Sequence, residues 1–134
     1  MLPETVFSVC NTSALFGWIV LLAGYQKSWS VRVARWLTLA FALVYVIVVG
    51  THFGEAEGGF GTLPEVMKLF TDRWVALGGW VHYLAFDLFI GAWIVSEGQR
   101  DGLPSWRVLP ALPLTFLFGP AGLLLFAVLR GKAL

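Results

Sequence analysis

Charge is scarce in this sequence. Only 13% of its 134 residues are Asp, Glu, Lys or Arg, whereas about 25% is usual for a soluble domain. Hydrophobic residues make up 58%, and the mean hydropathy is +0.79. This composition excludes a disordered chain and an ordinary soluble enzyme. The net charge is only +1, so there is no strongly basic surface for phosphates, and we expect no nucleic-acid partner.

Cysteine and the common catalytic motifs are also rare or missing. Cys10 is the single cysteine, which excludes an internal disulfide and a cysteine-rich metal centre. The sequence contains no recognisable Ser–His–acid set, phosphate-binding loop or dinucleotide fingerprint. No basic side chain precedes the first apolar run. We therefore expect that run to be a helix of the mature protein rather than a signal peptide.

Long apolar runs are abundant. A helix needs roughly 20 apolar residues to cross the hydrocarbon core of a bilayer. Runs of this length predict four spans, at about residues 5–26, 33–53, 74–97 and 108–130. The runs are apolar on nearly every side, as expected for helices in lipid. We predict an all-α integral membrane four-helix bundle that forms a single domain over residues 1–134.

The connection over 54–73 is long enough to hold structure of its own. Its first part is rich in glycine, and its second part has the pattern of a short amphipathic helix. Thr62 and Glu65 have the spacing of a capping box, and Pro64 suits the first turn of a helix. We expect this short amphipathic helix to lie at the membrane interface as a lid or collar.

The basic residues give almost no orientation in a four-span chain. The connections over 27–35 and 98–107 would share one face and hold five of the Lys and Arg residues, and the other face would hold four. The positive-inside rule needs a clear bias. The cluster over 27–35 only slightly favours the cytoplasm for its own face.

Asp87 is the strongest candidate for a functional group. It lies near the middle of the third predicted span, where a charge costs about 2.5–3.5 kcal/mol on insertion scales and usually marks a functional site. His82 lies five positions earlier and could line another wall of the same cavity. Trp80 and Tyr83 fall on the same helical face as Asp87 and would line a pocket with it. The alternatives are an acid that only holds helices together and an aromatic stripe that only packs.

Further groups complete the predicted pocket. Asn11, in the first span, can bond a ligand or another helix. His52 ends the second span, on the same side of the membrane as the start of the third, unless it is simply solvated. Pro120 interrupts the fourth span and frees the carbonyl of Phe116, which predicts a kink at mid-membrane depth. The substrate-binding residues we predict are Asn11, Trp80, Tyr83, Phe86, His52 and Phe116.

Four segments carry a family resemblance: ALFGWIVLL (14–22), LPEVMKLF (63–70), GWVHYLAFDLFIGAWI (79–94) and LTFLFGPAGLLLF (114–126). They resemble the abscisic-acid-deficient-four-like family of small membrane proteins, whose plant members are needed to make neoxanthin from violaxanthin. The most specific match is a Trp-x-His followed by Asp-Leu-Phe in the third span, carried by Trp80, His82, Asp87, Leu88 and Phe89.

The resemblance implies a carotenoid or related isoprenoid lipid as the substrate. Turning an epoxide into an allenic alcohol needs an acid at the oxygen and a base for a nearby proton, so we predict no cofactor. Asp87 would be the general acid and His82 the general base. The family resemblance and the apparent lack of a transit peptide favour the inner membrane of a bacterium. We also expect contact with membrane lipid and a homodimer through close contacts such as those of Gly78 and Gly79.

Two other functions stay open, so whether the protein is an enzyme is undecided. It could be a non-catalytic protein that binds a carotenoid, a retinal-like molecule or a quinone, or that assists the assembly of a membrane enzyme. It could also be a metal-dependent membrane enzyme that uses His52, His82 and a carboxylate. The sequence contains no Glu-x-x-His motif of the kind found in bundle di-iron sites, and we predict no metal.

Overall fold

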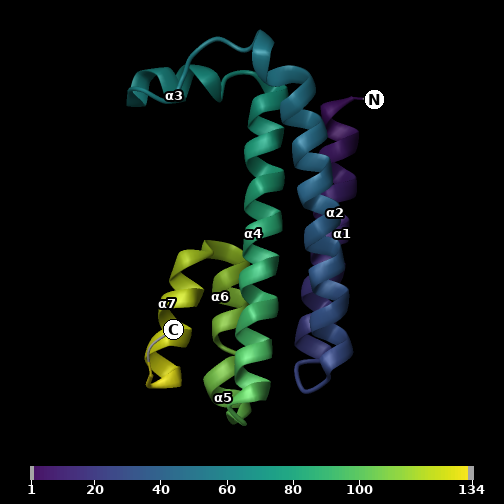
Figure 1. The fold of residues 1–134 in the computed structure, drawn as a ribbon, viewed down its shortest axis with the longest axis vertical. Helices are drawn as coiled ribbons and strands as arrows, with labels where there is room; N and C mark the ends of the chain where they lie inside the picture. The colour runs from purple at the N-terminus through teal and green to yellow at the C-terminus, as the bar shows by residue number, and fades with distance from the viewer. Residues whose placement is uncertain (1, 133–134) are drawn as a thin grey trace.

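Three long helices form the frame of the molecule. The computed structural model describes residues 2–132. Helices α1 (Pro3–Ala23), α2 (Ser28–His52) and α4 (Arg73–Arg100) run side by side along its long axis (Figure 1). All three are long and apolar enough to cross a membrane. The shorter helices are η1 (Phe53–Glu55), α3 (Leu63–Leu69), α5 (Ser105–Val108), α6 (Ala111–Phe118) and α7 (Pro120–Arg130). The predicted all-helical membrane bundle is confirmed.

Helix α4 is the centre of the bundle. It packs against α1, α2 and α6, and its side chains Val81, Leu88 and Ile94 are fully buried. Leu21 of α1 and Phe126 of α7 complete the core around it. The outward faces are apolar as well: on α2, the large hydrophobic residues Trp36, Leu39, Leu43, Val46 and Ile47 are all exposed. A surface of this kind suits contact with lipid chains rather than with water.

The short helix α3 begins as the sequence predicts. The hydroxyl oxygen of Thr62 accepts a hydrogen bond from the backbone N–H of Glu65, and the carboxylate of Glu65 accepts one from the N–H of Thr62 at 3.0 Å. This is the predicted capping box. Leu69 is buried at the end of the helix. Figure 1 shows α3 at the end of the bundle where α4 begins, reaching out on the same side of α4 as α6 and α7.

The segment 108–130 differs from the single span that its length suggests. Helices α6 and α7 pack against each other and fold back at mid-height of α4, so that both open ends of this hairpin lie near the end of α4 (Figure 1). They contain 8 and 11 residues. At about 1.5 Å per residue, neither approaches the roughly 30 Å of a bilayer core. The segment therefore has the form of a re-entrant hairpin, whose turn lies at about half the length of α4.

The reversal follows from two neighbouring residues. Gly119 has φ +35° and ψ −90°, a backbone conformation that side chains with a Cβ rarely adopt. Pro120 has no N–H to continue α6, but it suits the first position of α7. Beyond the turn, a Cβ at Gly122 would collide with the backbone and hydroxyl of Thr115. Gly122 therefore lets α6 and α7 pack in direct contact. The Gly119–Pro120 pair, which was predicted to kink the helix, reverses the direction of the chain.

Candidate functional site

The tip of the hairpin meets α4 at Asp87. This side chain lies near the midpoint of α4 and is only 8% exposed. A Cβ on Gly119 would lie 2.5 Å from its Oδ1 atom, so the turn and the carboxyl are in direct contact. Among residues 2–132, its buried Oδ2 atom has no hydrogen-bond partner. Helix α7 begins directly after this turn, beside the carboxyl.

Tyr83 lies one helical turn before Asp87 and holds the hairpin to α4. Its hydroxyl donates to the carbonyl oxygens of Phe116, at 2.7 Å, and Leu117, at 3.1 Å. These carbonyls are at the end of α6, where the turn stops the helical bonding. The sequence analysis predicted that the interruption of the helix at Pro120 frees the carbonyl of Phe116, and this prediction is confirmed. The side chain that uses it comes from another helix.

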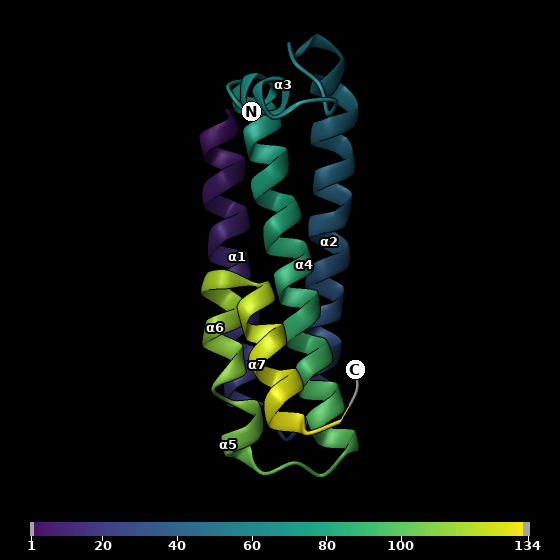
Figure 2. The same cartoon turned by 90° about the vertical axis from the view of Figure 1, so that its left-hand side faces the viewer.

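A groove between α1 and α4 ends at this junction. It consists of two cavities, of about 400 Å³ and about 380 Å³, that share Trp80 in their walls. In Figure 2 the hairpin lies beside the lower part of α4 and does not reach its upper part. We call the two cavities together the α1–α4 groove. Its residues are Pro3, Glu4, Phe7, Arg73, Ala76, Leu77 and Trp80, then Asn11, Thr12, Ala14, Leu15, Tyr83, Leu84, Phe116 and Leu117.

Aromatic rings form one wall of the α1–α4 groove. The ring of Trp80 lies between the rings of Phe7 and Tyr83. The distances between ring centroids are 5.9 Å to Phe7 and 5.1 Å to Tyr83. The indole N–H of Trp80 donates to the Oδ1 atom of Asn11 at 2.7 Å, which fixes the orientation of the ring. Aromatic and aliphatic walls with a few placed polar groups are typical of sites for lipophilic ligands. Four of the predicted substrate-binding residues line the groove: Asn11, Trp80, Tyr83 and Phe116.

His82 and Phe86 lie on a different face of α4. The imidazole of His82 packs against the ring of Tyr45 on α2, at 5.6 Å, and against Phe86, at 4.8 Å. Phe86 is 60% exposed. Neither residue is among those that line the α1–α4 groove. The role of His82 as a base stays a prediction. It is Tyr83, and not His82, that lies between the groove and Asp87.

His52 lines another cavity. Its ring stacks on that of Trp74 at 4.1 Å, and both residues border an apolar space of about 560 Å³ whose other walls come from α1 and α2. His52 was predicted to lie on the membrane side where the third span begins, and the structure places it at a cavity that shares no residue with the α1–α4 groove. Within the part of the chain that the structure describes, no group of three or more His, Cys, Asp or Glu side chains could hold a metal ion.

Sequence reasoning did not find the contact between Gly119 and Asp87, nor the part that Leu117 plays in the groove. The available signal was the Gly–Pro pair. It marks an interruption of the helix, but its residue types do not tell a kink from a reversal.

Three apolar spans, a re-entrant hairpin and a buried acid at half depth define a helical integral membrane protein. A comparison with protein families agrees with this class and narrows it. The family model described as ABA DEFICIENT 4-like matches residues 5–126. The chain belongs to this ABA4-like family, which links it to carotenoid and neoxanthin synthesis in membranes. Searches among curated proteins and among solved structures found no match.

Proposed function

We propose that the protein binds a carotenoid or a related isoprenoid lipid in the α1–α4 groove and isomerises it by acid–base chemistry at Asp87. The observation that carries this proposal is the junction at the hairpin tip. There, an aromatic groove ends at Tyr83, and a buried carboxyl with an unpartnered oxygen lies one helical turn further along α4.

The dimensions of the groove suit one end of a long polyene. From Arg73 at its mouth to Asp87 there are 14 residues along α4, or about 21 Å at the rise of an α-helix. A C40 carotenoid is about as long as a bilayer core is thick, roughly 30 Å. Such a molecule would place one end group at the hairpin tip and extend along the rings of Trp80 and Phe7 toward the α3 end of the bundle.

A single carboxyl can serve both halves of the reaction. The protonated acid of Asp87 gives its proton to the epoxide oxygen, with the hydroxyl of Tyr83 passing it into the groove, while the carbon–oxygen bond breaks. The resulting carboxylate, again through Tyr83, takes a proton from the carbon next to the opened epoxide. The product is an allenic alcohol, and the acid is restored. The substrate and product are isomers, so the balance needs no oxidant or reductant.

One observation favours a second candidate function, non-catalytic binding. The hydroxyl of Tyr83 already donates to two carbonyl oxygens of the hairpin, and Asp87 is not among the side chains that line the groove. In this arrangement the groove would hold a carotenoid without chemistry, and Asp87 and Tyr83 would only stabilise the turn.

Expression in carotenoid-producing cells, followed by chromatography of the pigments, tests the proposal. We expect the wild-type protein to convert an epoxide carotenoid. Asp87→Asn should insert into the membrane but form no product. Glu55→Gln is the matched control, because Glu55 is an exposed acid in η1, outside the groove. Full conversion by Asp87→Asn would contradict the catalytic role.

Two further variants separate the remaining alternatives. Product formation by His82→Ala would assign both proton transfers to Asp87, and its loss would support the predicted His82 base. Trp80→Ala should weaken pigment binding, because it removes the ring that both cavities share. A coloured wild-type protein that leaves every added carotenoid unchanged would favour the binding function over the enzymatic one.

A further inference from the structure

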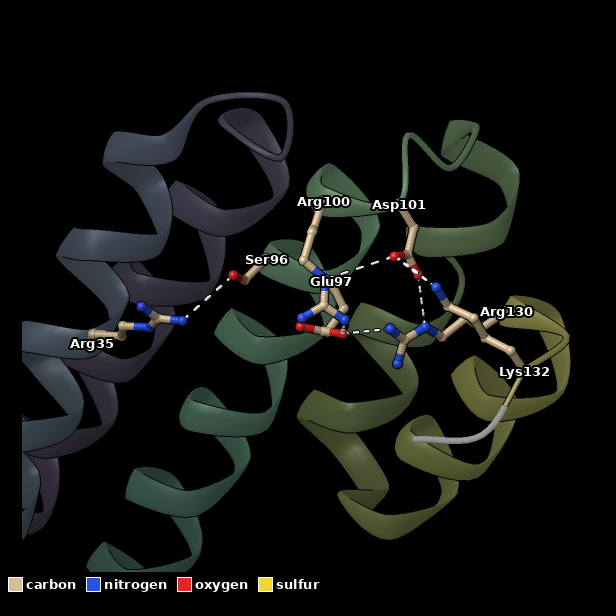
Figure 3. A network of polar contacts seen from close by, with 7 residues as sticks. All are labelled: Arg35, Ser96, Glu97, Arg100, Asp101, Arg130 and Lys132. Carbon is tan, nitrogen blue, oxygen red and sulfur yellow. Dashed lines mark hydrogen bonds and ion pairs between the residues drawn. The ribbon is translucent and has the colours of Figure 1, made fainter.

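Because α6 and α7 fold back as a hairpin, the last basic residues of the chain lie at the same end of the bundle as the C-terminus of α4. Arg130 and Lys132, at the end of α7, lie beside the end of α4 (Figure 3). Asp101 accepts from the Nε atom of Arg130 at 2.8 Å and from the Nζ atom of Lys132 at 2.9 Å. Arg130 also pairs with Glu97, and its side chain is only 2% exposed. These contacts tie the end of α7 to the membrane face where α4 ends.

This placement makes the two ends of the bundle unequal in charge. One end of the bundle contains the α1–α2 connection, the C-terminus of α4, helix α5 and the C-terminus of α7. We call it the basic end. It carries seven of the nine Lys and Arg residues and two acids. The opposite end carries two basic residues and five acids. The basic end holds Lys27, Arg32, Arg35, Arg100, Arg107, Arg130 and Lys132 with Glu97 and Asp101, and the opposite end holds Lys68 and Arg73 with Glu4, Glu55, Glu57, Glu65 and Asp72.

We infer that the basic end faces the cytoplasm and that the α1–α4 groove opens in the other half of the membrane. Lys and Arg near the ends of spans are retained on the cytoplasmic side. A single span over 108–130 would divide these residues almost equally and give no orientation. With three spans and a re-entrant hairpin, the ratio of seven to two is decisive. The anionic headgroups of a cytoplasmic leaflet complement this end as well.

The consequence for the ligand rests on the proposed function. The hairpin lies in the half of the bundle near the basic end (Figure 2). The groove runs in the other half, from Glu4 and Arg73 to the hairpin tip. A lipophilic substrate would therefore enter from the non-cytoplasmic leaflet. Its reactive end would reach Asp87 at mid-membrane, and α3 would lie over the mouth on the outer surface.

Labelling of single cysteines in spheroplasts of a bacterial host tests the orientation. The starting variant is Cys10→Ala, since Cys10 is the one native cysteine and is buried. Ser28→Cys and Ser105→Cys report on the basic end, and Glu55→Cys reports on the opposite end. Lys132→Cys is the decisive position, because it follows α7. Each variant is treated with a membrane-impermeant maleimide before and after permeabilisation, and the second treatment shows that each thiol can react.

We expect Glu55→Cys to be labelled in intact spheroplasts and the other three only after permeabilisation. Labelling of Lys132→Cys together with Glu55→Cys would show a fourth span and overturn the inference. The reverse pattern, or equal labelling at all four positions, would overturn the orientation. These results do not depend on any pigment. A failure to bind or convert a carotenoid would count against the proposed function alone.

Discussion

The hydroxyl of Tyr83 on α4 donates a 2.7 Å hydrogen bond to the carbonyl oxygen of Phe116 on α6. In a continuous helix that carbonyl would accept from residue 120, but Pro120 has no N–H. No water is present at the centre of a bilayer to replace the missing donor. Tyr83 thus supplies from a neighbouring helix the bond that the turn removes, and the same residue borders the groove and lies next to Asp87.

Tyr83→Phe should destabilise the protein without changing the shape of the ring. We expect a loss of about 0.6–2 kcal/mol in the free energy of unfolding, the range for hydrogen bonds between membrane helices. Denaturation in mixed detergent micelles measures it. Tyr45→Phe is the matched control, because the Tyr45 ring packs on His82, on the side of α4 away from the hairpin contact. Equal losses for the two variants would contradict a special role for the Tyr83 hydroxyl.

Gly119→Ala should open the hairpin tip. The added Cβ would lie 2.5 Å from Oδ1 of Asp87 in a residue with φ +35°. Alanine rarely adopts a backbone with φ +35° and ψ −90°, and the contact with the carboxyl adds to this cost. Gly102→Ala is the control for a positive φ without a close contact, since Gly102 has φ +62° and no atom within 4 Å of an added Cβ.

The double variant Gly119→Ala with Asp87→Ala separates the two causes. Removal of the carboxyl should recover part of the loss in stability, as measured by the same unfolding experiment. Strict additivity of the two substitutions would mean that the hairpin tip does not press on Asp87.

Much of the frame could be predicted from the sequence because lipid imposes simple rules. Long apolar runs give α1, α2 and α4 to within five residues at each end, and the Thr62–Glu65 spacing gives the start of α3. The segment 108–130 obeys the same rules for length and hydrophobicity. Its folding back depends on the φ angle of Gly119 and on the close contact between Thr115 and Gly122, which are matters of three-dimensional fit that an apolar composition does not encode.

The candidate site was predictable in part for a related reason. Helical periodicity places Trp80, Tyr83 and Asp87 on one face of α4. In the structure Trp80 and Tyr83 line the groove, and Asp87 lies against the hairpin tip without lining the groove. Periodicity does not say which neighbour covers which face. Because the hairpin lies against the face of Asp87, His82 is left on the side of α2, against Tyr45, although the two residues are close in sequence.

Arg130→Gln should weaken the attachment of α7 to α4 more than Lys132→Gln does. The Arg130 side chain is 2% exposed and bridges Glu97 and Asp101, whereas Lys132 is 55% exposed and reaches only Asp101. Removal of Arg130 takes away the buried cation that Glu97 and Asp101 share and leaves Glu97 with only the exposed Arg100. Loss of an exposed ion pair costs little. Limited proteolysis of the C-terminal end measures the release of α7. The double variant Glu97→Gln with Arg130→Gln should be less susceptible than Arg130→Gln alone, and greater susceptibility of the double variant would contradict the pairing.

The ionic contacts of Asp101 make the stability of the basic end depend on pH. Hydrogen bonds from Lys132 and Arg130 lower the pKa of Asp101 from 3.8 to about 2. Because the folded protein binds this proton more weakly than the unfolded chain, the contribution of Asp101 is fully present above about pH 4 and is lost as the pH falls toward 2. Thermal unfolding in detergent should show Tm falling through this window. In Asp101→Asn the fall should be shallower, since the titrating group is gone. An unchanged pH profile in that variant would mean that the carboxyl of Asp101 is not held by these two cations in the folded state.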